Sequence, residues 1–137
     1  MKQPEEVKRE FTRQWLEKAN GDYSTSNHLL SSGDAYLEAA TFHAQQAAEK
    51  YLKALLVWYQ IEFPKTHDLS LLISLASSRS PELVESLSAI QLLTPYGVEY
   101  RYPGDYPDIN KEDAHKAFET AGKVRAEIIG RLPTDIL

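Results

Sequence analysis

The sequence has 137 residues, of which 42% are hydrophobic and 26% are charged, and its formal net charge is −5 at pH 7. This length suits one ordinary domain, and this balance is typical of a globular chain rather than a disordered one. The acidic net charge argues against a dedicated duplex-DNA-binding protein, which normally presents a basic face. Cysteine is absent, which excludes disulfides, thiolate nucleophiles and cysteine-based zinc sites.

The first residues of the sequence, Met1 to Val7, are polar where a secretion signal would carry its apolar segment. No stretch approaches the roughly 20 apolar residues that a membrane-spanning helix needs. We therefore expect a soluble, cytoplasmic protein that has no membrane partner.

Helical periodicity runs through the whole sequence, and no segment alternates convincingly between apolar and polar residues as a strand does. Residues 5–31 are predicted to form a first long helix, with its buried stripe at fourfold spacing. This predicted stripe consists of Val7, Phe11, Trp15, Ala19, Tyr23 and Asn27, widened by Leu16 and Leu30. Gly33 is suited to cap the end of this helix, and Asp34 is suited to begin the next one.

Residues 35–60 are predicted to form a second long helix, which ends before Pro64 because proline lacks a backbone N–H and disfavours helix at the preceding residue. Its predicted core stripe consists of Tyr36, Ala40, Ala44, Ala47, Tyr51, Leu55 and Trp58. The many alanines of this helix would allow a neighbouring helix to approach closely.

Two shorter helices are expected next. The first covers residues 67–77, with Thr66 as its N-cap, and the second covers residues 81–93, with Ser80 as its N-cap and a proline at the first helical position. Both starts carry an acidic residue in or near the first turn, where a carboxylate favours the helix dipole.

Residues 94–109 contain three prolines and two glycines and are predicted to be a long irregular connection, a kind of loop that is often functional. The last helix is predicted to start after Asn110, with Asp113 completing a capping box, and to stop before Pro133. The sequence therefore predicts an all-α fold, an up-and-down bundle of about five helices, three long and two shorter, in a single domain over residues 1–137.

Three segments stand in a characteristic order along these elements: Phe42–Leu56 (FHAQQAAEKYLKALL) on the second helix, Thr66–Leu69 (THDL) at the third, and Tyr100–Pro103 (YRYP) after the fourth. With the alanine-rich last helix, this order resembles the HEPN domain (higher eukaryotes and prokaryotes nucleotide-binding domain), over a core of about residues 11–132. The resemblance implies a helical bundle, commonly a homodimer, that associates with nucleotides or RNA. It also implies a small nucleotidyltransferase as a partner, in pairs that often look like toxin–antitoxin systems.

Ribonuclease members of this family carry an arginine with a histidine a few residues after it. In this sequence the histidine after Arg101 is the distant His115, and no other arginine has a histidine at the required distance. This departure favours a binding role over metal-independent RNA cleavage, and we assign no catalytic residue.

The candidate nucleotide-binding residues are Lys53, His67, Asp68, Tyr100, Arg101 and Tyr102, supported by Gln46, Glu49, Lys50 and Lys65. A guanidinium can clamp a phosphate bidentately while a flanking tyrosine stacks on a base, and a His–Asp pair at a helix start can bind a ligand or transfer protons.

The same residues could instead have purely structural roles. Arg101 could pair with Glu49, and Glu49 with Lys53 could be an ordinary i,i+4 ion pair. His67 could be exposed or bonded to a neighbouring backbone group, while Asp68 only favours the helix dipole.

The remaining histidines, His28, His43 and His115, lack the spacing of metal ligands, and the sequence has no glycine-rich phosphate loop, so we expect no metal and no cofactor. Two alternatives to the binding module stay open. One is a ribonuclease whose histidine comes from a distant segment, such as His67. The other is a structural dimerisation protein that uses Trp15, Trp58 and several tyrosines as its interface.

Overall fold

The structure is a computed structural model of the chain and describes residues 3–96 and 108–137. Three long helices form its frame: α1 (Pro4–Leu30), α2 (Leu37–Tyr59) and α5 (Lys111–Ile129). Shorter helical pieces complete it: α3 (Leu69–Ala76), α4 (Leu83–Ser86) and the 3-10 helices η1 (Asp34–Tyr36), η2 (Ser88–Tyr96) and η3 (Thr134–Ile136). Over the described residues there is no strand, and the predicted all-α class is confirmed.

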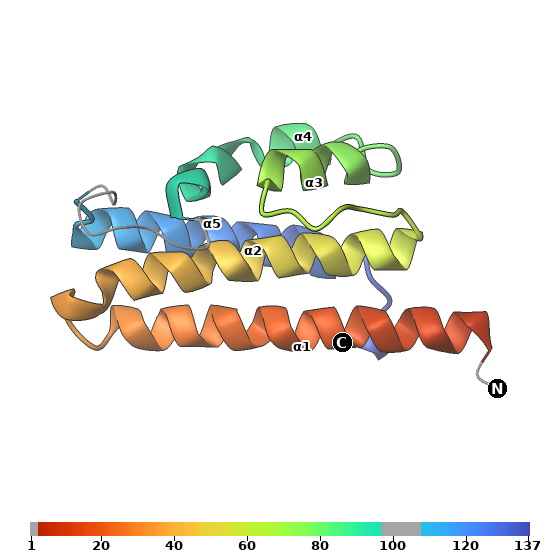
Figure 1. Cartoon of the computed structure of the whole chain (residues 1–137), viewed down its shortest axis with the longest axis horizontal. Coiled ribbons are helices and arrows are strands. Elements are labelled where there is room, and N and C mark those ends of the chain that lie inside the picture. The colour runs from red at the N-terminus through yellow and green to blue at the C-terminus, as the bar shows by residue number, and fades with distance from the viewer. Residues whose placement is uncertain (1–2, 97–107) are drawn as a thin grey trace.

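The elements form an up-and-down bundle. Figure 1 shows α1 running antiparallel to α2, and α5 running in the same direction as α2 behind it. The direction repeats because α3, α4 and η2 together carry the chain back along the other side of α2 (Figure 1). Helix α2 therefore lies at the centre. None of the helices in residues 3–96 and 108–137 is both long and apolar enough to span a membrane.

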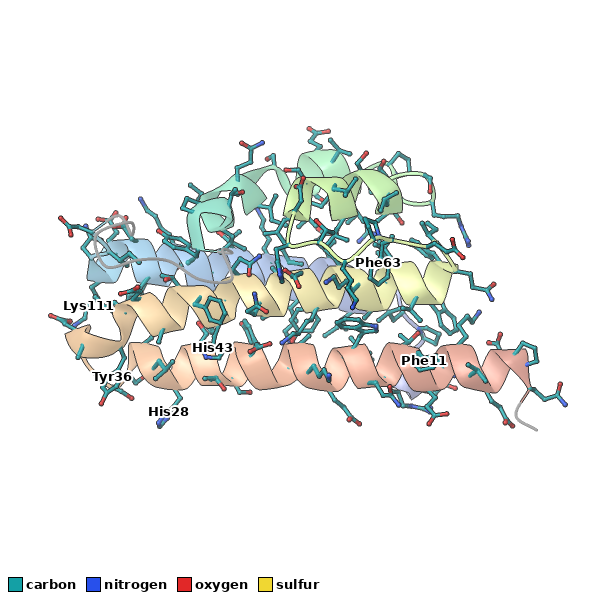
Figure 2. All side chains as sticks on the ribbon, in the orientation of Figure 1. Phe11, His28, Tyr36, His43, Phe63 and Lys111 are labelled. Carbon is teal, nitrogen blue, oxygen red and sulfur yellow. The ribbon has the colours of Figure 1, made fainter. Side chains whose placement is uncertain are left out.

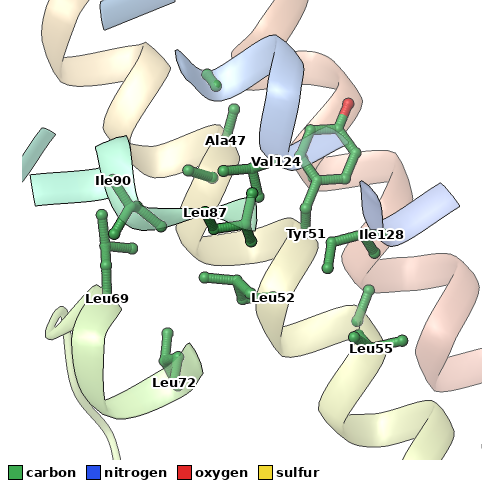
Figure 3. Packing of buried hydrophobic residues seen from close by; sticks show 14 of the residues in the cluster. Ala47, Tyr51, Leu52, Leu55, Leu69, Leu72, Leu87, Ile90, Val124 and Ile128 are labelled. Carbon is green, nitrogen blue, oxygen red and sulfur yellow. The ribbon is translucent and has the colours of Figure 1, made fainter. Parts of the chain in front are cut away.

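The buried core contains both small and large apolar side chains. Eight alanines of α2 and α5 are almost fully buried: Ala40, Ala44, Ala47, Ala48, Ala54, Ala114, Ala117 and Ala121. Figure 3 shows Tyr51, Leu52 and Leu55 of α2 pointing into a space that is shared with side chains of α3, η2 and α5. Packing on several sides explains why α2 is hydrophobic around much of its circumference.

The predicted stripe on the first helix is wrong at two positions. Phe11 is 51% exposed, and Asn27 is also exposed. The buried residues of α1 are Thr12, Leu16, Ala19, Ser26 and Leu30. Each step of four residues advances about 40° beyond one full turn of a helix with 3.6 residues per turn. A stripe with strict fourfold spacing therefore drifts away from the buried face. The observed steps of three and four stay on it.

The junction between the first two helices also differs from the prediction. Helix α1 ends earlier than expected, with Ser31 at its C-cap, and Gly33 adopts φ 114°, where glycine has no steric penalty. The next turn is the short η1, so Tyr36 lies before α2 and is exposed instead of buried. Leu37 takes the buried position.

Helix α3 is capped by Asp68 rather than by the predicted Thr66. The Asp68 carboxylate accepts a hydrogen bond from the backbone N–H of Leu71 at 3.1 Å. Thr66 acts one step earlier, since its hydroxyl accepts from the N–H of Asp68 at 3.0 Å. Both side chains thus shape the segment that leads into α3.

The predicted helix over residues 81–93 is two elements instead of one. Helix α4 covers a single turn, and η2 follows it. Leu87, Ile90 and Leu93 are buried at spacings of three, which is the period that places side chains on one face of a 3-10 helix. Ser80 is not an N-cap, because its side chain is buried and hydrogen-bonded to the Tyr59 hydroxyl.

The predicted start of the last helix is confirmed. The N–H of Asp113 donates to the Asn110 side chain at 2.8 Å, and the Asp113 carboxylate accepts from the N–H of Asn110 at 3.2 Å. This reciprocal capping box depends only on local sequence, which is why it could be predicted.

An ion pair between Arg131 and Glu82 ties the end of α5 to the start of α4. Arg131 donates to the Glu82 carboxylate at 2.7 Å, and this hydrogen bond lowers the pKa of Glu82. A carboxyl group whose pKa is lower in the folded state stabilises the fold fully above its ordinary pKa. This contribution is lost as the pH falls through the lowered folded pKa.

Glu82→Gln is therefore expected to lower the urea midpoint slightly at neutral pH, and the difference from the unmodified protein is expected to vanish in acid. Urea unfolding of both proteins, from neutral to acidic pH, measures this difference in midpoint. Glu85→Gln is the matched control, because Glu85 is an exposed acid nearby that makes no ion pair within the described residues. A difference that persists unchanged at the acidic end would contradict the assignment.

Candidate functional site

The candidate site is centred on a buried carboxylate of α2. The side chain of Glu49 is only 3% exposed. Its Oε2 atom accepts from Lys53 Nζ at 3.0 Å, and its Oε1 atom accepts from His67 Nδ1 at 2.8 Å. Glu49 therefore joins a cation one turn along its own helix to an imidazole on the segment before α3.

Two glutamines extend this network along α2. Gln45 Nε2 lies 3.5 Å from Glu49 Oε1, and Gln46 Nε2 donates to Gln45 Oε1 at 2.8 Å. None of these side chains has a buried polar atom without a partner. A buried polar network in which each buried polar atom has a partner holds its members in one arrangement.

Lys53 lies inside this arrangement rather than on its surface. Its side chain is 9% exposed, and its ammonium lies 5.4 Å from the centroid of the Trp15 ring and 5.8 Å from that of Phe63. The two rings meet edge to face at 6.3 Å, and Figure 2 shows Phe63 beside α2. Lys53 thus neutralises Glu49 under an aromatic cover.

His67 reaches the surface from this network. Helix α2 ends at Tyr59, and the left-handed backbone of its C-cap residue Gln60 (φ 59°) turns the chain. The connection to α3 then runs back over α2 (Figure 1). This return brings His67 to Glu49, and 39% of the His67 side chain remains exposed. The contact of Nδ1 with the carboxylate restrains the orientation of the imidazole ring.

The structure gives different positions to three other predicted site residues. Lys50 donates to Asp22 Oδ2 on α1, on a different face of α2 from Glu49. Asp68 caps α3, as described above, and Lys65 is exposed. The predicted residues Tyr100, Arg101 and Tyr102 lie outside the described residues. The structure thus brings together Gln46, Glu49, Lys53 and His67.

Two polar features were missed from the sequence. Gln45 belongs to the Glu49 network, and its position one turn before Glu49 was the signal that could have shown it. His43 Nδ1 contacts Asp22 Oδ1 at 2.8 Å, and Figure 2 shows His43 between α1 and α2. The second contact depends on how α1 and α2 are aligned, for which the sequence contains no local signal.

No candidate metal site is present in residues 3–96 and 108–137. This part of the chain contains no group of three histidine, aspartate or glutamate side chains that could hold a metal ion. The chemistry available at the Glu49 network is hydrogen bonding and proton transfer by an oriented imidazole.

Comparison with known proteins agrees with the fold. The family model of the HEPN domain matches residues 12–132. The crystal structure of an archaeal HEPN homologue is similar, with a TM-score of 0.66 and 23% sequence identity, covering 88% of this chain and 96% of that chain. A search of the curated proteins found no match. Because the family model spans most of the sequence, and the fold agrees with that of a solved homologue, this chain belongs to the HEPN domain family.

Proposed function

We propose that this chain is a nucleotide- or RNA-binding module whose ligand contacts His67. The Glu49 network holds the His67 ring in place through the contact with Nδ1. Family membership supports a nucleotide- or RNA-related role. The observation that carries the proposal is the contact of 2.8 Å between buried Glu49 and half-exposed His67. It holds a polar ring in one orientation at the surface, which lowers the entropic cost of binding.

The neighbourhood of His67 offers the other parts that a nucleotide needs. An imidazole can donate a hydrogen bond to a phosphate oxygen or accept one from a ribose hydroxyl. Lys53 lies one helical turn after Glu49, and the rings of Trp15 and Phe63 lie around it. These rings supply flat apolar surface, the kind on which bases stack. We propose that Arg101, between two tyrosines in the sequence, supplies the phosphate clamp.

Fluorescence anisotropy with a labelled single-stranded RNA of about twelve nucleotides and with a fluorescent ATP analogue tests this proposal. His67→Gln and Arg101→Gln are each expected to weaken binding about tenfold or more, because each removes a hydrogen bond that involves a charged group. His28→Gln is the matched control, since His28 is exposed and points away from the bundle (Figure 2). Equal binding by the His67 and His28 variants would refute the site.

A ribonuclease is the second candidate, and the same Glu49–His67 contact favours it. A carboxylate that orients an imidazole is an arrangement used for general acid–base catalysis. If the chain cleaves RNA, cleavage in the presence of EDTA is expected to fall about a hundredfold or more in His67→Gln and to be unaffected in His28→Gln. Absence of RNA cleavage by the unmodified chain, assayed alone, ends this candidate.

We further propose that the module acts as a homodimer beside a small nucleotidyltransferase, as a toxin–antitoxin-like pair. The family resemblance motivates the pairing, and exposed apolar side chains such as Phe11, Val84 and Leu92 supply surface for an interface. Light scattering is expected to give twice the mass of one chain. A neighbouring gene for a small nucleotidyltransferase, and co-purification of its product, would support the partner, whereas a monomeric mass would refute the dimer.

A further inference from the structure

Apart from the Glu49 network, a cleft lies between α1, α5 and the C-terminal turn η3. It has a volume of about 480 Å³, within the usual size range of small-molecule sites. Its lining includes Arg13 and Asn20 of α1 and Arg125 of α5. None of the residues of the Glu49 network lines it. What this cleft binds is therefore a question separate from the function proposed above.

Two arginines line this cleft, and neither has a carboxylate partner among the described residues. Arg13 makes no hydrogen bond or ion pair within residues 3–96 and 108–137. Arg125 lies 5.6 Å from the centroid of the Tyr23 ring and beside the hydroxyl of buried Tyr51, and it too has no ion pair in the described part of the chain. Both cations are thus available to an anion that enters the cleft.

Asn20 adds a neutral donor to the lining of the cleft. Its side-chain oxygen accepts a hydrogen bond from the Tyr51 hydroxyl, which fixes the orientation of the amide. The NH₂ group of the same amide is then left to donate elsewhere. The hydroxyl that fixes it stays protonated over a wide pH range, since burial raises the pKa of Tyr51 to about 12.

Two acidic side chains also line the cleft. Asp135 is already paired with Arg9 at 3.2 Å. Glu17 is exposed and makes no ion pair among the residues described. The cleft is therefore lined by two guanidinium groups and by the acidic side chains of Glu17 and Asp135, of which Asp135 is already paired.

Part of the lining of the cleft is apolar. Leu16 and Ile136 are buried core residues, and Ile129 lies beside them half-buried. An apolar lining in the same cleft as two arginines suits a ligand that has an anionic head and a hydrophobic body. Burying that body adds binding free energy in proportion to the apolar area that leaves water.

We propose that this cleft binds a small organic anion, with a phosphate or carboxylate head held by Arg13, Arg125 and Asn20. The body of the ligand lies against Leu16, Ile129 and Ile136. The shared chemistry is an anionic head on an apolar body, and a phosphate ester and a carboxylate are the two sources that the test compares.

Isothermal titration calorimetry of the full chain with four probes tests the proposal: phenyl phosphate, benzoate, inorganic phosphate and neutral benzyl alcohol. Saturable binding is expected for phenyl phosphate or benzoate, and the tighter of the two identifies the head group. Inorganic phosphate is expected to bind about tenfold more weakly than phenyl phosphate, because it does not use the apolar wall. Benzyl alcohol is expected not to bind measurably.

Arg13→Gln and Arg125→Gln are each expected to weaken binding of the preferred probe about tenfold. Lys123→Gln is the matched control, because it removes the same charge from an exposed position on α5 that is not part of the cleft. Arg125 also contacts Tyr23 and Tyr51, so Arg13→Gln, which breaks no described contact, decides the test if the Arg125 variant unfolds.

No saturable binding of either phenyl phosphate or benzoate to the unmodified chain would overturn the proposal. Equal weakening by Arg13→Gln and Lys123→Gln would overturn it too, because the charge would then act only at long range. His67→Gln is expected to leave probe binding unchanged. Failure of the RNA-binding proposal and failure of the anion cleft are therefore distinguishable.

Discussion

Glu49→Gln is expected to lower the free energy of unfolding by about 3 kcal/mol, because it leaves the buried ammonium of Lys53 without its counter-charge. The pair is almost completely buried, with side-chain exposures of 3% for Glu49 and 9% for Lys53. The double variant Glu49→Gln/Lys53→Met removes both charges and is expected to recover most of the loss. Urea unfolding of the three proteins measures these differences.

An exposed pair of the same type gives a matched control. Glu112 and Lys116 are also four residues apart on one helix, at 3.2 Å, but Glu112 is 75% exposed. Glu112→Gln is expected to change the free energy of unfolding by less than about 0.5 kcal/mol, because solvent screens an exposed pair. If Glu49→Gln costs no more than this control, the buried network does not stabilise the fold.

The same substitution also tests the site. Without the carboxylate, His67 loses the contact at 2.8 Å that orients it. The affinity of Glu49→Gln for RNA is therefore expected to fall about as far as that of His67→Gln, at a temperature where both variants remain folded. The Glu49→Gln/Lys53→Met variant is expected to recover stability without recovering affinity, which separates the two effects.

Leu52→Ala is expected to lower the free energy of unfolding by about 3 kcal/mol, the usual cost when a fully buried leucine is truncated and a cavity remains. Leu52 is completely buried in the cluster that joins α2 to α3, η2 and α5, and Figure 3 shows it among these elements. The loss weakens the contact that holds α3 on α2. Since His67 lies just before α3, His67 is then held less firmly against Glu49.

Urea unfolding and native-state amide exchange measure this effect. Protection of the α3 amides is expected to fall more than protection of α1, because α1 packs on a different side of α2. Leu92→Ala is the control, because Leu92 is 53% exposed and is expected to cost less than about 0.5 kcal/mol. A loss in Leu52→Ala as small as in this control would show that the α3 layer is not anchored at this point.

Features that depend on neighbours along one helix could be predicted. The existence of α1, α2 and α5, the capping box at Asn110 and the ion pair between Glu49 and Lys53 all depend on contacts within one turn or so of the chain. The HEPN resemblance rests on short segments of this kind, and the family match confirms it. The prediction failed where tertiary packing selects between local alternatives, as at α4 and η2.

The sequence by itself determined the all-α class, the three long helices and the charges that meet along one turn of a helix, because each is encoded in residues close together in the chain. Only the tertiary structure decided that His67 returns to Glu49, that Lys50 turns to Asp22 and that Arg13 and Arg125 share a cleft. These pairs are separated by many residues. Their distances are set by how loops turn and how helices pack, and no local pattern encodes either.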